Sequence, residues 1–145
     1  MTTQPKQLAA IGTLPHALPA CANARLALFA LRRIGANGLA DAGAAHAMFT
    51  AFGEGFRRPL ILLRALMADI AASAGGTIAI APCCCSRMTT AEAALLTILS
   101  RVETAPEAAR LLMADLLGQR RVDGVLASAA AVAAAFADEG RPVAA

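Results

Sequence analysis

The sequence predicts an all-α fold, a bundle-like single domain of about six helices, on three observations. The chain has 145 residues, close to the commonest size of a single domain. Hydrophobic residues make up 58% of the chain and alanine is the most frequent of them, and alanine is the best helix former. Apolar side chains also recur at positions i, i+3, i+4 and i+7 in segments joined by short loops, which is typical of helices that bury one face.

The first three helices are expected at about residues 24–34, 42–52 and 59–74. Asn23 and Asp41 are good N-caps for the first two, and Pro59 suits the first turn of the third because its φ angle is already helical. Glycines follow all three segments. The side chains expected on their buried faces are Leu26, Phe29, Ala30 and Arg33, then Ala45, Met48, Phe49 and Phe52, then Leu63, Leu66, Met67 and Ile70.

Three more helices are expected at about residues 89–102, 105–117 and 123–139. Thr89 and Glu92 have the spacing of a capping box, in which each side chain binds a free backbone N–H of the other residue. Thr104 and Glu107 repeat that spacing, and Asp123 is the expected cap of the last helix. The expected buried side chains are Leu95, Ile98, Leu99 and Val102, then Ala108, Leu111, Leu112 and Leu116, then Val125, Leu126, Ala129, Val132, Ala133 and Phe136.

One short extended segment is expected at about residues 77–81, where the sequence TIAIA lies between two glycines and Pro82. A single strand has no partner within a helical chain. The segment is therefore either an extended connector or a strand that pairs across a dimer axis.

The domain boundaries are expected at residues 1–22 for an irregular N-terminal arm, 23–140 for the helical domain and 141–145 for a tail. Prolines and a glycine interrupt the apolar residues of the arm, which argues against an export signal. The longest apolar run, residues 125–137, has thirteen residues, whereas a membrane span needs about twenty. We therefore expect no membrane association and a cytoplasmic location, where thiols are normally reduced.

The chemically distinctive feature is the run Cys83, Cys84 and Cys85, just ahead of the helix that starts near Thr89. In an extended segment Cys83 and Cys85 point to the same side, so they could grip one soft metal ion such as zinc. The positive end of the following helix and the neighbouring Arg87 are also features that lower the pKa of a thiol and make it more reactive.

A closed zinc site needs four ligands, and the chain offers few partners for the cysteine run. The other donors of the usual kinds are Cys21, His16 and His46. His46 is expected to be partly buried and satisfied by a carbonyl, and His16 to be solvated. Packing of three small side chains is the simplest account of the run, with a reactive thiol and a metal site as the alternatives. No cofactor is the simplest expectation.

Arg57 and Arg58 stand at the start of a predicted helix, where cations are unfavourable and free N–H groups attract anions. Together with Arg87 they are the candidate anion-binding residues. Pairing of Arg57 and Arg58 with Glu54 or Asp41 is the simpler alternative. Nucleic acid is not an expected partner, because aromatic residues amount to only 3% and the helix that follows is too apolar to read a groove.

Two stretches resemble a small uncharacterised family of alphaproteobacterial proteins. They are FRRPL at residues 56–60 with LRALM at 63–67, and APCCC-x-RMT at residues 81–89. The resemblance runs from about residue 23 to about residue 118. It implies a bacterial protein and no assigned activity, so no functional residue can be carried over.

No catalytic set, phosphate-binding glycine loop or paired carboxylates can be recognised, which argues against an enzyme. The leading hypothesis is a non-enzymatic helical domain that acts by association, as a homodimer and in regulation, because its apolar surface is large for its size. The alternative is a thiol-based metal-binding or redox-sensing protein that uses Cys83 and Cys85, with Cys21 or His46 as further ligands.

Overall fold

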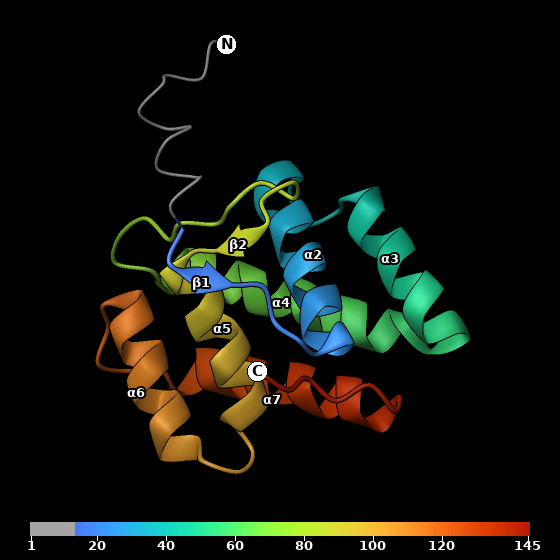
Figure 1. The fold of residues 1–145 in the computed structure, drawn as a ribbon. Helices are drawn as coiled ribbons and strands as arrows, with labels where there is room; N and C mark the ends of the chain where they lie inside the picture. The colour runs from blue at the N-terminus through green and yellow to red at the C-terminus, as the bar shows by residue number, and fades with distance from the viewer. Residues whose placement is uncertain (1–13) are drawn as a thin grey trace, which may run out of the picture.

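The computed structural model describes residues 14–145, and this part of the chain folds into six α-helices with one very short sheet (Figure 1). The all-α prediction is confirmed. The helices are α2 (Ala22–Asn37), α3 (Ala42–Phe52), α4 (Arg57–Ser73), α5 (Thr90–Arg101), α6 (Pro106–Leu117) and α7 (Asp123–Asp138). A 3-10 turn, η1 (Gly53–Phe56), joins α3 to α4, and the two strands are β1 (His16–Ala17) and β2 (Arg87–Met88).

The core lies where α4 packs along α7, with α5 and α6 forming one flank and α2 and α3 the other (Figure 1). Phe136 of α7 is fully buried there, and its ring meets Phe52 edge to face at a centroid distance of 5.1 Å. No helix in residues 14–145 is long and apolar enough to cross a membrane.

The capping signals of the sequence were right for two helices and wrong for three. Asn23 is not the cap of the first helix, because it lies inside α2. Thr89 and Glu92 form the full capping box ahead of α5, and Asp41 accepts a hydrogen bond from Ala44 N at 2.8 Å ahead of α3. The second capping box is wrong, because α6 starts after Ala105 without a side-chain cap. The sixth helix has no side-chain cap either, since Asp123 is its first residue.

The buried faces are as predicted in α5 and α7 and rotated from the prediction in α2 and α6. In α2 the core side is made by Ala24, Ala27, Leu28, Leu31 and Ile34. Two stripes with helical spacing run along this helix, and the one rich in alanine packs inward because small side chains let neighbouring helices approach closely. Phe29 is therefore 40% exposed, and Leu111 of α6 is 73% exposed.

The expected extended segment is a connector in this chain and not a strand. Residues 77–80 run without a turn, with Ile78 and Ile80 half-buried and Thr77 and Ala79 exposed. The connector lies against α2 at Gly35, where an added Cβ would come within 3.3 Å of Ile80 Cγ2. An added Cβ at position 35 would therefore require the Ile80 side chain to shift by a few tenths of an ångström.

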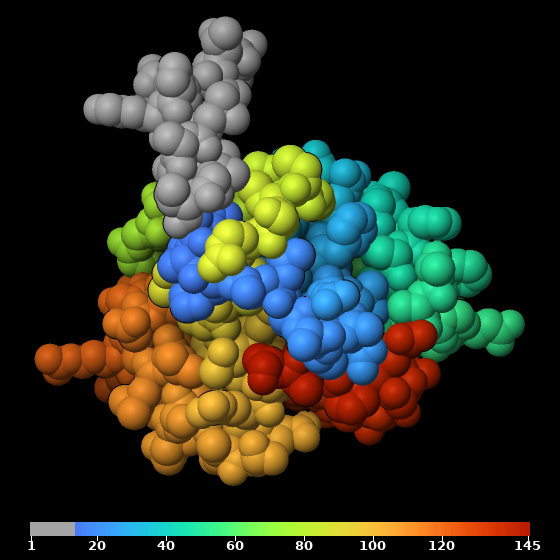
Figure 2. Space-filling view, in the orientation of Figure 1, coloured from blue at the N-terminus to red at the C-terminus, as the bar shows by residue number. Residues whose placement is uncertain are grey.

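The small sheet was not predicted. β1 pairs with β2 in antiparallel register, with His16 opposite Met88 and Ala17 opposite Arg87. Figure 2 shows the consequence on the surface, where the first residues that the structure describes lie beside the segment that follows the cysteine run. The two parts are some seventy residues apart in the sequence and form one face of the molecule.

Candidate functional site

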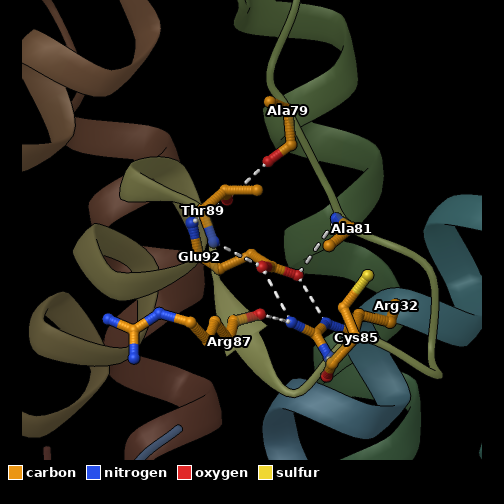
Figure 3. Close-up of polar contacts among 7 residues, drawn as sticks. All are labelled: Arg32, Ala79, Ala81, Cys85, Arg87, Thr89 and Glu92. Carbon is orange, nitrogen blue, oxygen red and sulfur yellow. Dashed lines mark hydrogen bonds and ion pairs between the residues drawn. The ribbon is translucent and has the colours of Figure 1, made fainter. Parts of the chain in front are cut away.

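A buried ion pair lies beneath the cysteine run and joins α2 to α5 (Figure 3). Arg32 Nε donates to Glu92 Oε2 at 2.7 Å, and Arg32 Nη2 donates to Glu92 Oε1 at 3.1 Å. Arg32 is 2% exposed and Glu92 is fully buried. Two-point contact between a guanidinium and a carboxylate is among the strongest arrangements of charged hydrogen bonds. Sequence reasoning missed this pair, because its members are sixty residues apart.

The carboxylate of Glu92 is also the centre of the capping box. Thr89 N donates to Glu92 Oε1 at 2.9 Å, and Glu92 N donates to Thr89 Oγ1 at 3.0 Å. Ala81 N donates to Glu92 Oε2 at 3.2 Å, and Thr89 Oγ1 donates to Ala79 O at 2.7 Å. Each carboxylate oxygen therefore has two donors, one of them from Arg32. A buried charge that is paired and fully hydrogen-bonded in this way can be tolerated.

Arg32 holds the cysteine turn by its backbone. Arg32 Nη1 donates to Cys85 O at 2.9 Å, and Arg32 Nη2 donates to Arg87 O at 2.7 Å. Cys85 N donates to Pro82 O at 3.1 Å, which closes the turn over residues 82–85. The hydrogen bond to Glu92 raises the pKa of Arg32, so this guanidinium stays charged. We call these contacts of Arg32, Glu92 and Thr89 the clasp.

Arg87 faces the start of the chain. Its Nε donates to Leu14 O at 2.6 Å and its Nη2 donates to Pro15 O at 3.0 Å. These bonds continue the pairing of β1 with β2. The guanidinium that was expected to activate the thiols thus binds the backbone of residues 14 and 15.

The three cysteines of the run form no disulfide within residues 14–145 and differ in exposure. Cys83 and Cys84 are exposed, and Cys85 is half-buried. Cys83 and Cys85 line one cavity of about 160 Å³, shared with Arg25 and Arg32. The sequence had suggested an extended segment at Cys83–Cys85. The backbone instead turns at these residues.

Burial raises the pKa of the Cys85 thiol, and the neighbouring Cys84 raises it further. For Cys85, the expected lowering of the thiol pKa by the following helix is wrong. The main physical reason is burial of the thiol, and the carboxylate of Glu92, which occupies the positive end of α5 in the capping box, makes a smaller contribution in the same direction.

Cys21 and His46, the other candidate ligands, lie elsewhere. Cys21 is the N-cap residue of α2, eleven residues before Arg32, which is about 16 Å along a helix. A hydrogen bond from the backbone of Ala24 lowers the pKa of Cys21 against the opposing effect of burial. His46 is exposed on α3, so the expected partly buried position is wrong. Within residues 14–145, no three His, Cys, Asp or Glu side chains gather as a metal-ligand group.

Arg57 and Arg58 are both exposed at the start of α4. Arg58 Nη1 donates to Asp138 Oδ2 at 2.7 Å. The expected pairing with Glu54 or Asp41 is therefore wrong for Arg58. Asp41 binds Arg33 instead, through two hydrogen bonds of 3.0 and 3.1 Å.

A larger hollow lies against the connector, residues 77–80. It has a volume of about 350 Å³ and is lined by Gly35 of α2, by apolar side chains of α4 and α5, and by Ile78 and Ile80. A second hollow of about 270 Å³ adjoins it and shares Gly35, Met67 and Ala71 as lining residues. We call the two together the apolar groove. Charged side chains are absent from the lining of both hollows.

A family model described as a family of unknown function, DUF6628, matches residues 9–115. The matched stretch contains the clasp, the cysteine turn and the apolar groove. The same kind of comparison finds no match among curated proteins or among solved structures. The match covers well over half of the sequence, and the chain therefore belongs to this family of unknown function.

Proposed function

We propose that the chain is a non-enzymatic association domain of a bacterial cytoplasm, with residues 23–140 as its helical domain, and that it acts in regulation as a homodimer. The observation that carries this proposal is an unpaired backbone edge at the connector, beside the apolar groove. An unpaired edge of this kind is a template on which another chain can add a strand.

The edge follows from the way the clasp holds the connector. In extended backbone, alternate residues direct their N–H and C=O groups to the same edge. Ala79 O and Ala81 N bind Thr89 and Glu92, so the odd-numbered residues face α5. The backbone N–H and C=O groups of Ile78 and Ile80 then point to the edge away from α5. Within residues 14–145 these groups make no hydrogen bond.

The apolar groove favours a second copy as the occupant of this edge. Two connectors paired antiparallel about a twofold axis would satisfy each other's N–H and C=O groups. The same contact would cover the mouth of the groove and Leu39 beside it, which is 44% exposed. Apolar surface removed from water contributes roughly 25 cal/mol per Å², so this cover adds stability to the pairing.

Light scattering after size exclusion tests the homodimer. We expect a mass of twice 14.7 kDa for the natural chain and a monomer for Ala79→Lys, because pairing would bring the two lysines close together. Ala79 is exposed, so the fold should tolerate the change. Ala127→Lys, at an exposed position of α7, is the matched control and should remain a dimer. A natural chain that stays monomeric at high concentration would contradict the proposal.

A thiol-based metal or redox sensor is the second candidate, favoured by the shared cavity of Cys83 and Cys85. Two thiols can supply half of a tetrahedral zinc site, and because Cys21 and His46 lie elsewhere, the remaining ligands would come from solvent or a partner. Metal analysis of protein purified under reducing conditions, together with thiol-labelling rates, tests it. Absence of metal combined with labelling no faster than that of a free cysteine would contradict this candidate.

A further inference from the structure

We propose that Cys83 and Cys85 exchange with a small disulfide that carries negative charges, such as a disulfide of a carboxylate-bearing thiol peptide. This inference rests on the second candidate function and names the partner of its thiols. It starts from three observations, which are the position of the two thiols in one cavity, the arginines around that cavity and the anchoring of the turn.

The surroundings of the thiols are positively charged. Arg25 and Arg32 line the cavity. Cys83 also lies close to Arg33, where it adds to the effect of Asp41 in raising the pKa of that guanidinium. With Arg87 in the turn itself, four arginines stand against two carboxylates, Glu92 and Asp41, which leaves two positive charges in excess.

Two of these arginines keep donors for a ligand. Arg25 uses its Nε on Pro19 O at 2.6 Å, and its two terminal nitrogens have no partner within residues 14–145. Arg33 uses Nε and Nη2 on Asp41, and within the same residues its Nη1 has no hydrogen bond to an oxygen. Arginine binds carboxylates well because its planar group presents paired donors. Arg32 uses four of its five N–H groups in the clasp and fixes the turn.

The size of the cavity also selects the partner. About 160 Å³ is less than the usual volume of a pocket for a drug-sized ligand. It can take the two sulfur atoms of a small disulfide and the carbons next to them, while charged ends remain outside among the arginines. Leu28 and Phe29 supply the apolar wall that the carbons would contact.

The exposure of the thiols assigns the order of the steps. The exposed Cys83, as thiolate, attacks one sulfur of the small disulfide, breaks its S–S bond and releases one small thiol. Cys85, as thiolate, then attacks the Cys83 sulfur and releases the second small thiol. The protein loses two electrons and gains a Cys83–Cys85 disulfide, and the small disulfide gains the two electrons and, through solvent, the two thiol protons. The raised pKa of Cys85 agrees with its acting second.

The test compares oxidised glutathione, which is negatively charged, with cystamine, which is positively charged. Each rate is divided by the rate of the same chain unfolded in urea, which removes the intrinsic reactivity of the reagents. We expect the folded chain to favour oxidised glutathione by roughly tenfold or more at low salt, and to lose much of that preference at high salt. Mass spectrometry identifies the residues that react.

Variants sharpen the test. Arg25→Glu should reverse or abolish the preference, whereas Arg101→Glu, at an exposed position of α5, should leave it unchanged. Cys85→Ser should stop at the mixed disulfide on Cys83, Cys83→Ser should prevent formation of the Cys83–Cys85 disulfide, and Cys84→Ser should still form it. Circular dichroism confirms that each variant is folded.

The possible outcomes distinguish failure of the proposed selection for a negatively charged disulfide from failure of the thiol-based candidate function on which it rests. Equal normalised rates with the two reagents, while a Cys83–Cys85 disulfide still forms, would overturn the charge selection and leave a redox site. Reaction confined to Cys84 or Cys21 would overturn both. Fast reaction of Cys85 in the Cys83→Ser variant would overturn the assigned order of attack.

Discussion

Two ion pairs of the same length join distant parts of this molecule and lie in opposite surroundings. Arg32 binds Glu92 at 2.7 Å in the core, and Arg58 binds Asp138 at 2.7 Å on the surface. The side chains of the first pair are 3% and 0% exposed, and those of the second are 54% and 61% exposed. Burial, and not distance, decides what each pair does.

The exposed pair gains little because water and salt screen its charges and both long side chains lose freedom. The buried pair cannot be separated so cheaply, since either partner alone would be a charge without compensation. Arg32 also organises the backbone around it, because it holds Cys85 O and Arg87 O. A substitution at Arg58 therefore has a local effect, whereas one at Arg32 disturbs α2, α5 and the cysteine turn together.

The largest effect should come from Arg32→Met, which leaves the carboxylate of Glu92 buried without its partner. We expect the free energy of unfolding to fall by about 3–5 kcal/mol, measured by urea denaturation. The double variant Arg32→Met with Glu92→Gln should recover part of this loss, because it removes both charges and keeps a capping oxygen. A loss below about 1 kcal/mol in the single variant would show that the pair is not buried in solution.

A smaller effect is expected for Thr89→Ala, which removes the cap of Glu92 N and the bond to Ala79 O. Loss of a helix cap costs about 0.5–2 kcal/mol, and one hydrogen bond about 1 kcal/mol more. Thr89→Ser keeps the hydroxyl and is the control. Comparing the thermal unfolding midpoints of Thr89→Ala and Thr89→Ser separates the contribution of the hydroxyl from that of the methyl group. Equal midpoints for the two variants would contradict a stabilising role of the capping hydroxyl.

The effect of Asp41 on stability should lie between those of the buried and the exposed ion pair, and it should depend on pH. The hydrogen bond from Arg33, and next the N–H of Ala44, lower the pKa of Asp41 in the folded chain. Its contribution to stability is therefore complete above the unfolded value of about 3.9 and is lost as the pH falls through the lower folded value. Asp41→Asn should be less stable than the natural chain at pH 7, and the gap should close below about pH 4. A gap independent of pH would exclude the charge as its source.

The smallest effect is expected for Asp138→Asn, which breaks the exposed pair with Arg58. The free energy of unfolding should change by less than about 1 kcal/mol, and less still in high salt. Arg58→Ala should give a similar result, since each variant removes the same contact. A loss as large as that of Arg32→Met would erase the contrast between the two pairs.

The same contrast separates what could be predicted from the sequence from what could not. The capping box at Thr89 and Glu92 and the buried stripe of α7 depend on residues within a few turns of each other, and both predictions are confirmed. The ion pair of Arg32 with Glu92 and the pairing of β1 with β2 join segments sixty or more residues apart. Local spacing carries no signal for such contacts.

Helix faces were predicted well only where one apolar stripe was available. In α6 the leucines are so frequent that several faces are apolar, and packing against α5 selects Met113 and Leu117 while Leu111 stays exposed. At the candidate site, residue types indicated the thiols but not the groups around them. A lone arginine on the apolar side of a helix, such as Arg32, is the signal that could have pointed to a buried acidic partner.

The way in which Arg32 holds the cysteine turn has a consequence for how this surface can change. Its bonds end on the carbonyl oxygens of Cys85 and Arg87, and every residue type supplies such an oxygen. The side chains at positions 83, 84 and 86 are exposed and take no part in those bonds. Mutation at these positions can therefore replace the chemistry of the turn, by loss or gain of thiols, charges or rings, while its backbone stays in place. The backbone of the cysteine turn can thus stay constant while the side chains at positions 83, 84 and 86 vary.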